Sequence, residues 1–289
     1  MDEQDLGRIG VVGGGLMGSG IAEVCARAGL DVVVVERDRS AVEAARRRLE
    51  GSLDRAVHRG KLAAEDRDAA LAATEIVDDM DALADRDLVV EAVAEDEGVK
   101  TEVFTRAGAI VKRPDAIFAS NTSSIPIMKL GMATDRPGQV VGMHFFNPVP
   151  VLSLVEIVPS LLTEARTRER AEAFVVDVLG KQPVRSQDRA GFVVNALLVP
   201  YLLSAVRMME SGFASAEDID AGMVRGCAHP MGPLALTDLI GLDTTKAIAE
   251  SMYEEFKEPL YSPPPMLSRM VDAGLLGRKS GRGFYEYAS

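Results

Sequence analysis

The sequence predicts an α/β protein in which a doubly wound parallel sheet is followed by an all-helical C-terminal domain. Up to residue 188, apolar strand-like runs alternate with amphipathic helical patterns, which is typical of a parallel sheet covered on both faces. Beyond it, helical patterns follow one another with no strand between them. The 289 residues exceed the usual size of a single domain. We therefore expect one domain at 1–187 and a second at 188–289.

The strands and helices of the first domain are expected in alternation. The strand-like runs lie at 8–12, 31–35, 87–91, 116–119, 139–143 and 153–158. The helical patterns lie at 16–28, 40–58, 97–112 and 163–180, and those of the second domain at 191–212, 215–226, 232–239 and 241–256. Because open parallel sheets bind ligands at the carboxyl ends of their strands, side chains at those ends are the first candidates for a site.

A glycine-rich turn joins the first strand to the first helix and has the spacing of a dinucleotide-binding turn. Gly13 permits the sharp turn, Gly15 lets a pyrophosphate approach the backbone, and Gly18 lets the helix pack close to the sheet. The N-terminus of the helix then offers free N–H groups and a partial positive charge to the phosphates. The residues expected to bind the cofactor here are Gly13, Gly14, Gly15, Leu16, Met17 and Gly18.

Glu36 follows the second apolar run, 18 residues after Gly18, close to the spacing of about 20 at which such domains carry an acidic residue for the ribose. A carboxylate at this place accepts hydrogen bonds from ribose hydroxyls and repels a 2′-phosphate, so NAD is the expected cofactor rather than NADP. Arg37 and Arg39 stand beside it and weaken this preference. Strand, turn, helix, strand and carboxylate together predict a Rossmann-type domain.

The composition argues against several classes of function. A net charge of −12 and a pI near 4.9 speak against nucleic acid as a partner. Two cysteines far apart predict no disulfide framework, and three histidines without clustered Cys/His spacing predict no metal site. The N-terminus is acidic (Asp2, Glu3, Asp5) and no long apolar run precedes the first strand. We expect neither a signal peptide nor a membrane span, and hence a cytoplasmic protein.

His144 follows one predicted strand and Glu156 lies within the next. Hydride chemistry on a nicotinamide needs a proton acceptor from the protein, and His144 would stand at the sheet edge where ligands bind. Glu156 is flanked by Val155 and Ile157, and a carboxylate in such a run is costly to bury without a partner. The two side chains are expected to pair, with the carboxylate fixing the tautomer of a catalytic base. A purely structural buried ion pair is the alternative.

Two further sets of polar side chains are candidates for the same site. Residues 120–124 follow an apolar strand, where their hydroxyls and amide would face the ligand crevice; an ordinary helix N-cap is the alternative. Asn195 is polar in an otherwise apolar helix of the second domain, where it faces a site or makes an interhelical hydrogen bond.

The second predicted helix and the residues just after it carry a basic face on an otherwise acidic protein. The residues are Arg46, Arg47, Arg48, Arg55, Arg59 and Lys61. A solvated surface is the usual explanation of such a run, and a docking site for a polyanion, such as a phosphate-bearing ligand, is the alternative.

Together these segments resemble the short-form L-3-hydroxyacyl-CoA dehydrogenase family, in particular its bacterial 3-hydroxybutyryl-CoA dehydrogenases. The resemblance covers nearly the whole chain, and several of its motifs are rare in themselves. The motifs lie at 13–18, 91–95, 120–124, 144–150, 191–195, 230–233 and 281–285. Two departures, Ala190 where proline is common and Ala196 where arginine is common, remove no reacting group.

The resemblance implies an NAD-dependent oxidoreductase that interconverts an L-3-hydroxyacyl-CoA and the 3-ketoacyl-CoA in fatty-acid or butanoate metabolism. His144 looks like the catalytic base and Glu156 like its partner. Ser123 and Asn195 look like the groups that hold the reacting oxygen.

The resemblance also implies where the two ligands bind. The positions that match cofactor contacts are Glu95, Lys100, Ser123, Asn147 and Lys279. The positions that match contacts to the acyl-CoA, or lie close to them, are Ser52, Arg59, Lys61, Ser123 and Asn195. The family dimerises through its helical domain, so a homodimer is expected.

Three other functions compete with this one. A dehydrogenase of a free hydroxy acid on the same fold would usually lack Phe145 and Phe146 after the histidine. A binding or structural protein on this fold would not need both His144 and Glu156. An acyl-carrier-protein substrate in place of CoA stays open, as does the length of the acyl chain.

Overall fold

The computed structural model describes residues 6–287. The chain divides into two compact units, Met1–Asp188 and Arg189–Ser289, so the division falls one residue beyond the boundary expected from the sequence. The acidic N-terminal residues Asp2, Glu3 and Asp5 lie outside the described residues. No helix within residues 6–287 combines the length and the apolar composition that crossing a membrane requires.

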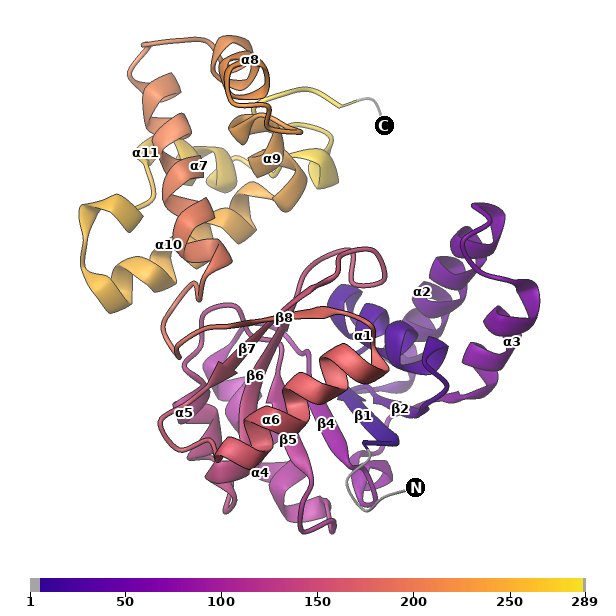
Figure 1. The fold of residues 1–289 in the computed structure, drawn as a ribbon. Coiled ribbons are helices and arrows are strands. Elements are labelled where there is room, and N and C mark those ends of the chain that lie inside the picture. The colour runs from indigo at the N-terminus through magenta and orange to yellow at the C-terminus, as the bar shows by residue number, and fades with distance from the viewer. Residues whose placement is uncertain (1–5, 288–289) are drawn as a thin grey trace. The chain divides into compact units, whose positions relative to one another are not determined.

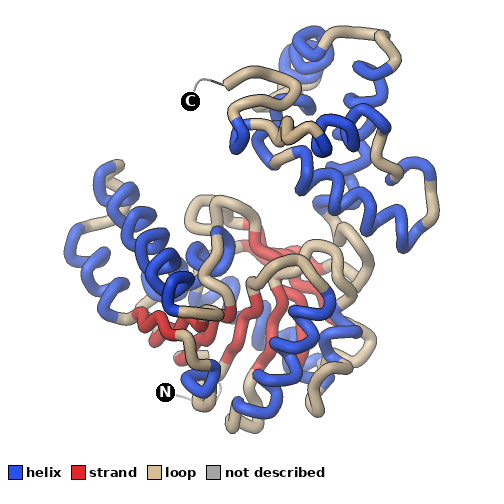
Figure 2. The backbone as a smooth tube through the Cα atoms, turned by 180° about the vertical axis from the view of Figure 1, so that it is seen from behind, coloured by secondary structure: helices blue, strands red, loops and turns tan. Residues whose placement is uncertain are grey.

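The first unit is built on one eight-stranded sheet with helices on both faces (Figures 1 and 2). The strands are β1 (Arg8–Val12), β2 (Asp31–Val35), β3 (Thr74–Val77), β4 (Leu88–Glu91), β5 (Ile117–Ser120), β6 (Val140–Phe145), β7 (Leu154–Pro159) and β8 (Gln182–Arg185). The α-helices of this unit are α1 (Leu16–Arg27), α2 (Arg39–His58), α3 (Ala64–Ala72), α4 (Glu97–Ile110), α5 (Ile127–Gly131) and α6 (Ala165–Ala173).

The strand order is β3-β2-β1-β4-β5-β6-β7-β8, and the order reverses at β1. In such a sheet the crevice at the reversal point, beyond the carboxyl ends of the strands, is where a ligand binds. The glycine turn leaves β1 at this point, between the ends of β2 and β4. The predicted Rossmann-type fold is therefore confirmed.

The sheet is not wholly parallel, and on this point the sequence prediction was wrong. Strand β7 runs antiparallel to β6, and β8 runs parallel to β7. The physical reason is the connection at 146–153, which is shorter than the dozen or so residues that a parallel crossover needs.

The two faces of the sheet pack against different helices. Val141 and Met143 of β6 and Ile157 of β7 belong to an apolar core shared with α1, α2 and α6. Residues between them point the opposite way because side chains alternate along a strand. A side chain built at Gly142 would meet Ile127 of α5, so His144 and Glu156 lie on the α5 face.

Four elements of the first unit were not predicted, namely α3, β3, α5 and β8. Both β3 and β8 are short strands at the edges of the sheet, and most side chains of β8 are exposed. Such strands carry no continuous apolar run. The helix expected at 163–180 begins as α6 and continues as a π-turn over Phe174–Val178.

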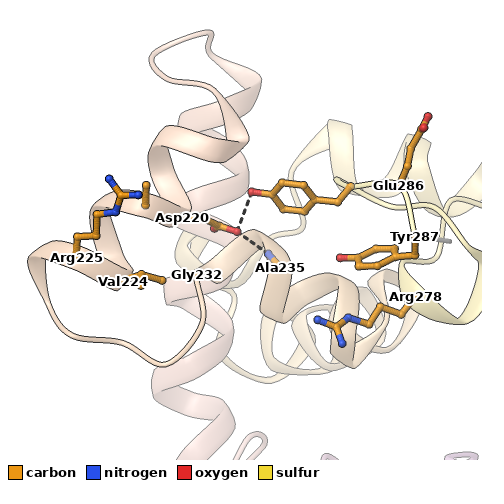
Figure 3. Close-up of a pocket in the computed structure, with 10 residues that line it drawn as sticks. Asp220, Val224, Arg225, Gly232, Ala235, Arg278, Glu286 and Tyr287 are labelled. Carbon is orange, nitrogen blue, oxygen red and sulfur yellow. Dashed lines mark hydrogen bonds between the residues drawn. The ribbon is translucent and has the colours of Figure 1, made fainter.

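The second unit is all-helical in its regular elements, as predicted. Its helices are α7 (Val194–Glu210), α8 (Ala216–Gly226), α9 (Pro233–Ile240), α10 (Leu242–Phe256) and α11 (Pro265–Asp272). Asp220 of α8 accepts hydrogen bonds from the backbone of α9 and from the hydroxyl of Tyr285, which fixes the C-terminal segment to the helices (Figure 3). The hollow beside it has a volume of about 490 Å³ and is lined only by residues of this unit.

Candidate active site

The glycine turn after β1 has the geometry that a bound pyrophosphate needs. Gly13 has a φ of +93°, which a side chain would strain. A side chain at Gly18 would overlap the carbonyl oxygen of Gly13, so the helix packs directly against the turn. A side chain at Gly15 would meet no protein atom within 4 Å. The open space at Gly15, the N-cap of α1, fits a dinucleotide phosphate, because no side chain caps the N–H groups there.

Glu36 lies directly after β2 and reaches back to this turn. Its Oε1 accepts a hydrogen bond from the backbone N–H of Gly14 at 2.7 Å. Arg37 turns toward Asp38, to which its Nε donates at 3.1 Å. The carboxylate therefore stands beside the phosphate turn, where the adenosine ribose of a dinucleotide would lie.

His144 and Glu156 face each other across the antiparallel strands β6 and β7. They are partners in the strand register, and His144 Nδ1 lies 2.7 Å from Glu156 Oε2. Glu156 has no exposed surface, and His144 is 7% exposed. The ring of Phe146 packs against the imidazole with a centroid distance of 4.5 Å. A buried carboxylate on Nδ1 makes this histidine a well-oriented imidazole at the carboxyl end of β6.

A turn after β5 is gathered around one oxygen of Glu95. Glu95 Oε1 accepts hydrogen bonds from Ser123 N at 2.9 Å and Ser124 N at 3.1 Å, and from the hydroxyls of Thr122, Ser123 and Ser124. Burial acts to raise the pKa of Glu95, but the charge of Lys100 and these hydrogen bonds lower it below its usual range. Glu95 is therefore an ionised acceptor. The helix N-cap that was the alternative at 120–124 is not formed by these residues, because the N-cap of α5 is Pro126.

Lys100 lies behind Glu95 and has almost no exposed surface. Its Nζ is 2.6 Å from Glu91 Oε1 and 3.3 Å from Glu95 Oε2. Both Lys100 and Glu91 are 1% exposed. The ammonium of Lys100 is thus held by two carboxylates, and the cofactor contact expected of this residue stays a prediction.

Asn121 joins the ends of β5 and β6. Its Oδ1 accepts a hydrogen bond from the backbone N–H of Phe145 at 2.8 Å. This hydrogen bond joins the turn that carries Ser123 to β6 at Phe145, one residue beyond His144.

A basic groove of about 850 Å³ lies between α1, α2 and the segment 147–151. It brings together five residues expected to bind the ligands: Leu16, Ser52, Arg59, Lys61 and Asn147. Further lining residues are Ser19, Gly20, Glu23, Arg27, Arg47, Arg48 and Arg55. The basic face of α2 is thus one wall of a groove that begins at the glycine turn, which favours the polyanion hypothesis over a purely solvated surface.

The remaining two predicted site residues belong to the second unit. Asn195 lies in the first turn of α7 and is 8% exposed. Lys279 pairs with Asp243 at 2.6 Å and keeps about half of its side chain exposed.

Sequence reasoning did not assign roles to Glu91 or Lys181. Glu91 ends an apolar strand, so the argument that singled out Glu156 would also have found it. Lys181 is buried and donates to the carbonyl oxygens of Val149 and Leu152, which holds the segment beside the basic groove. Nothing in the sequence around Lys181 signals this contact.

A dinucleotide turn with its carboxylate, a carboxylate-bound histidine and a basic groove on one Rossmann-type unit define an NAD-dependent dehydrogenase. The family model of the 3-hydroxyacyl-CoA dehydrogenase NAD-binding domain matches residues 8–189, and that of the C-terminal domain of the same enzymes matches residues 191–287. The chain therefore belongs to the 3-hydroxyacyl-CoA dehydrogenase family, with NAD as its cofactor. The resemblance noted in the sequence motifs is confirmed.

Proteins from bacteria and animals are similar to this one along nearly the whole chain. The 3-hydroxybutyryl-CoA dehydrogenase of Mycobacterium tuberculosis is 60% identical over 280 residues, which cover 97% of this chain and 98% of that protein. The mitochondrial hydroxyacyl-coenzyme A dehydrogenase of Homo sapiens is 43% identical over 285 residues, which cover 96% of this chain and 90% of that protein.

Solved structures of such enzymes superpose closely on this one. FadB2 of M. tuberculosis gives a TM-score of 0.97 at 59% identity, over 98% of this chain and 99% of that chain. The (S)-3-hydroxybutyryl-CoA dehydrogenase PaaH1 of Ralstonia eutropha gives 0.93 at 44% identity, over 99% of this chain and 100% of that chain. The fold described above is therefore that of this group of proteins.

Proposed function

We propose that the chain interconverts L-3-hydroxybutyryl-CoA and acetoacetyl-CoA with NAD, in fatty-acid or butanoate metabolism. The observation that carries the proposal is the His144–Glu156 pair at the carboxyl edge of the sheet, on the same unit as the glycine turn and the basic groove. The M. tuberculosis and R. eutropha relatives are named for the four-carbon substrate, which supports the same substrate here.

His144 acts as the base that takes the proton of the 3-hydroxyl group. Because Glu156 binds Nδ1, the neutral imidazole keeps its proton on Nδ1 and Nε2 is the basic nitrogen. The Glu156 carboxylate then stabilises the imidazolium that forms when Nε2 is protonated. NAD, when bound, supplies the hydride acceptor for C3. In the reverse direction, protonated His144 is the acid that donates a proton to the oxygen on C3 and so forms the 3-hydroxyl group.

Ser123 and Asn195 hold the substrate oxygen as it changes between hydroxyl and carbonyl. The hydrogen bonds of Ser123 to Glu95 support this role, because they fix the backbone and hydroxyl beside the end of β5. The glycine turn and Glu36 would hold NAD, and Ser52, Arg59 and Lys61 would hold the CoA phosphates. A free hydroxy acid carries no phosphates for the basic side chains of this groove to bind, which favours the CoA ester.

The enzyme is expected to prefer NADH to NADPH, because the Glu36 carboxylate at the glycine turn opposes a 2′-phosphate. Replacing Glu36 with Ser should narrow the gap in kcat/KM between the two cofactors, since Arg37 and Arg39 could then meet the phosphate. Steady-state kinetics with both cofactors check this. Equal efficiency of the unmodified enzyme with NADH and NADPH would mean that the arginines already offset Glu36.

Oxidation of NADH with acetoacetyl-CoA, acetoacetyl-pantetheine and free acetoacetate tests the proposed substrate. We expect the highest kcat/KM with the CoA ester, because only it carries the phosphates that the basic groove would bind. Replacing both Arg59 and Lys61 with Ala should raise the KM for acetoacetyl-CoA about three- to tenfold. The kcat should change less, since these contacts are remote from C3 and similar in the ground and transition states.

The pantetheine ester is the matched control for the double variant. Its KM should stay unchanged, because it lacks the phosphates, and added salt should weaken CoA-ester binding more in the unmodified enzyme than in the variant. Free acetoacetate as the best substrate would overturn the proposal. An unchanged KM of the double variant at low salt would place the CoA phosphates elsewhere, and an acyl-carrier-protein substrate would then be the next candidate.

We also propose a homodimer formed through the second unit. Leu197 of α7 is 74% exposed and Phe213, just beyond α7, is 79% exposed. A contact with a second subunit would remove such apolar side chains from water. The cytoplasmic location stays a prediction from the sequence.

A further inference from the structure

Glu23 is a buried carboxylate in the wall of the basic groove, where every other charged lining residue is a cation. It lies on α1, and its side chain is 1% exposed. A carboxylate at this place opposes phosphate binding and loses hydration by its burial, so its presence requires a partner. Its Oε2 has no hydrogen-bond partner within residues 6–287, and its Oε1 lies 3.3 Å from Nη1 of Arg27. The partner of Glu23 is therefore Arg27.

Arg27 ends α1 and lines the basic groove together with Lys61, which follows α2. The same two residues also line a neighbouring hollow of about 610 Å³, so the end of α1 and the segment after α2 lie close together here. The Arg27 side chain is 29% exposed, and in the described part of the chain its guanidinium donates to Glu23 alone. Because a guanidinium carries several N–H donors, most of them are left for a ligand.

The charges behind this end of the groove favour a bound anion. Burial lowers the pKa of the Lys181 ammonium, and the charge of Arg27 lowers that pKa further. Two cations are thus held near each other at the end of α1. A phosphate beside Arg27 would reduce their repulsion.

Arg27 stands at the end of the groove that is remote from the reacting carbon. Leu16 lines the other end and follows directly on the glycine turn, at the carboxyl edge of the sheet. From Leu16 to Arg27 the helix rises by about 16 Å. In the proposed function the thioester reacts at the carboxyl edge, so the nucleotide of a CoA ester that fills the groove comes to lie toward Arg27.

We propose that Arg27 binds a phosphate of the CoA nucleotide and that Glu23 positions its guanidinium for this contact. The proposal rests on the function proposed above, in which the groove binds an acyl-CoA. Cations of α1 and of the segment after α2 then hold the phosphate from two sides. The i,i+4 pair with Glu23 keeps an arginine at a helix end folded back along the helix, where it would otherwise extend into water.

Arg27→Gln tests the phosphate contact in steady-state oxidation of NADH. Gln can still donate to Glu23 but carries no charge. We expect the KM for acetoacetyl-CoA to rise about three- to tenfold and kcat to change by less than about twofold, since the contact is remote from C3. The KM for acetoacetyl-pantetheine, which lacks the phosphates, should stay unchanged. With the 3′-dephospho-CoA ester, a persistent effect of R27Q assigns the contact to the diphosphate and a lost effect assigns it to the 3′-phosphate.

Two further variants complete the test. Arg106→Gln is the matched control, because Arg106 also pairs with a glutamate four residues earlier, Glu102 on α4 at 3.9 Å, but lies outside the groove. It should leave KM and kcat unchanged. Glu23→Gln should raise the KM for acetoacetyl-CoA about twofold or more, and should have no effect in the R27Q background, where the group that it positions is gone. Thermal unfolding of each variant separates these effects from loss of the fold.

Different results would overturn the two parts of the proposal. An unchanged KM of R27Q for acetoacetyl-CoA, or an equal rise for the pantetheine ester, would overturn the phosphate contact. A KM that E23Q leaves unchanged or lowers would remove the positioning role of Glu23. Free acetoacetate as the best substrate of the unmodified enzyme would overturn the proposed function and this inference with it, whereas a preferred CoA ester with an unaffected R27Q overturns this inference alone.

Discussion

Replacing His144 with Gln is expected to lower kcat at least about a hundredfold, the low end of what general acid–base catalysis contributes. Gln keeps a polar group that can reach Glu156 but cannot exchange a proton with the substrate. The strand register that places His144 opposite Glu156 should survive, so the fold and the Kd for NADH should be retained. Single-turnover kinetics and NADH titration measure the two quantities separately.

Glu156→Gln is the companion variant. It should also be slow, because the imidazolium loses its counter-charge, with a smaller effect on cofactor binding. A near-normal kcat in H144Q would remove His144 from the mechanism. Aggregation of E156Q beside a well-folded H144Q would show that Glu156, which has no exposed surface, is chiefly structural.

Replacing Gly15 with Ala is expected to weaken NADH binding at least about tenfold, or ~1.4 kcal/mol, without loss of stability. The backbone of Gly15 has a φ of −65°, which alanine adopts, and the new methyl group would meet no protein atom within 4 Å. It would instead occupy the space through which the pyrophosphate approaches the turn. The free energy of unfolding should stay unchanged or rise by up to ~1 kcal/mol.

Gly18→Ala is the matched comparison, since it adds the same methyl group three residues later. That methyl group would overlap the carbonyl oxygen of Gly13, so this variant should lose stability as well as cofactor binding. Calorimetric unfolding together with NADH titration distinguishes the two variants. If G15A binds NADH normally, the phosphate does not approach this part of the turn.

The first strand, helix and second strand could be predicted closely because they carry strong local patterns. The runs expected at 8–12 and 31–35 are β1 and β2 to the residue. Strand β8 could not be found, because an edge strand of Gln182, Pro183, Val184 and Arg185 has no apolar period. The direction of β7 was missed for another reason: an apolar run does not encode strand polarity, and only the length of the connection before it does.

The candidate site could be predicted where a charged residue stands in an otherwise apolar stretch of the sequence. Glu156 stands out because a carboxylate in an apolar strand requires a partner, and the contact expected with His144 is present. The burial of Lys100 could not be predicted, since a lysine in an amphipathic helix is ordinarily solvated. Its place against Glu91 depends on how α4 packs on the sheet, which is a tertiary property.

Because β6 and β7 are antiparallel neighbours, His144 and Glu156 are encoded close together in the gene although they face each other across two strands. Both residues lie within residues 140–159, on two strands joined by a short connection. Recombination with both breakpoints outside this stretch would carry the two residues together into a new context. A one-residue insertion within either strand would turn the side chains on one side of the insertion to the opposite face of the sheet. An insertion that moved His144 or Glu156 in this way would separate the two side chains. The pairing of His144 with Glu156 therefore depends on the register of β6 and β7 and on no element outside residues 140–159.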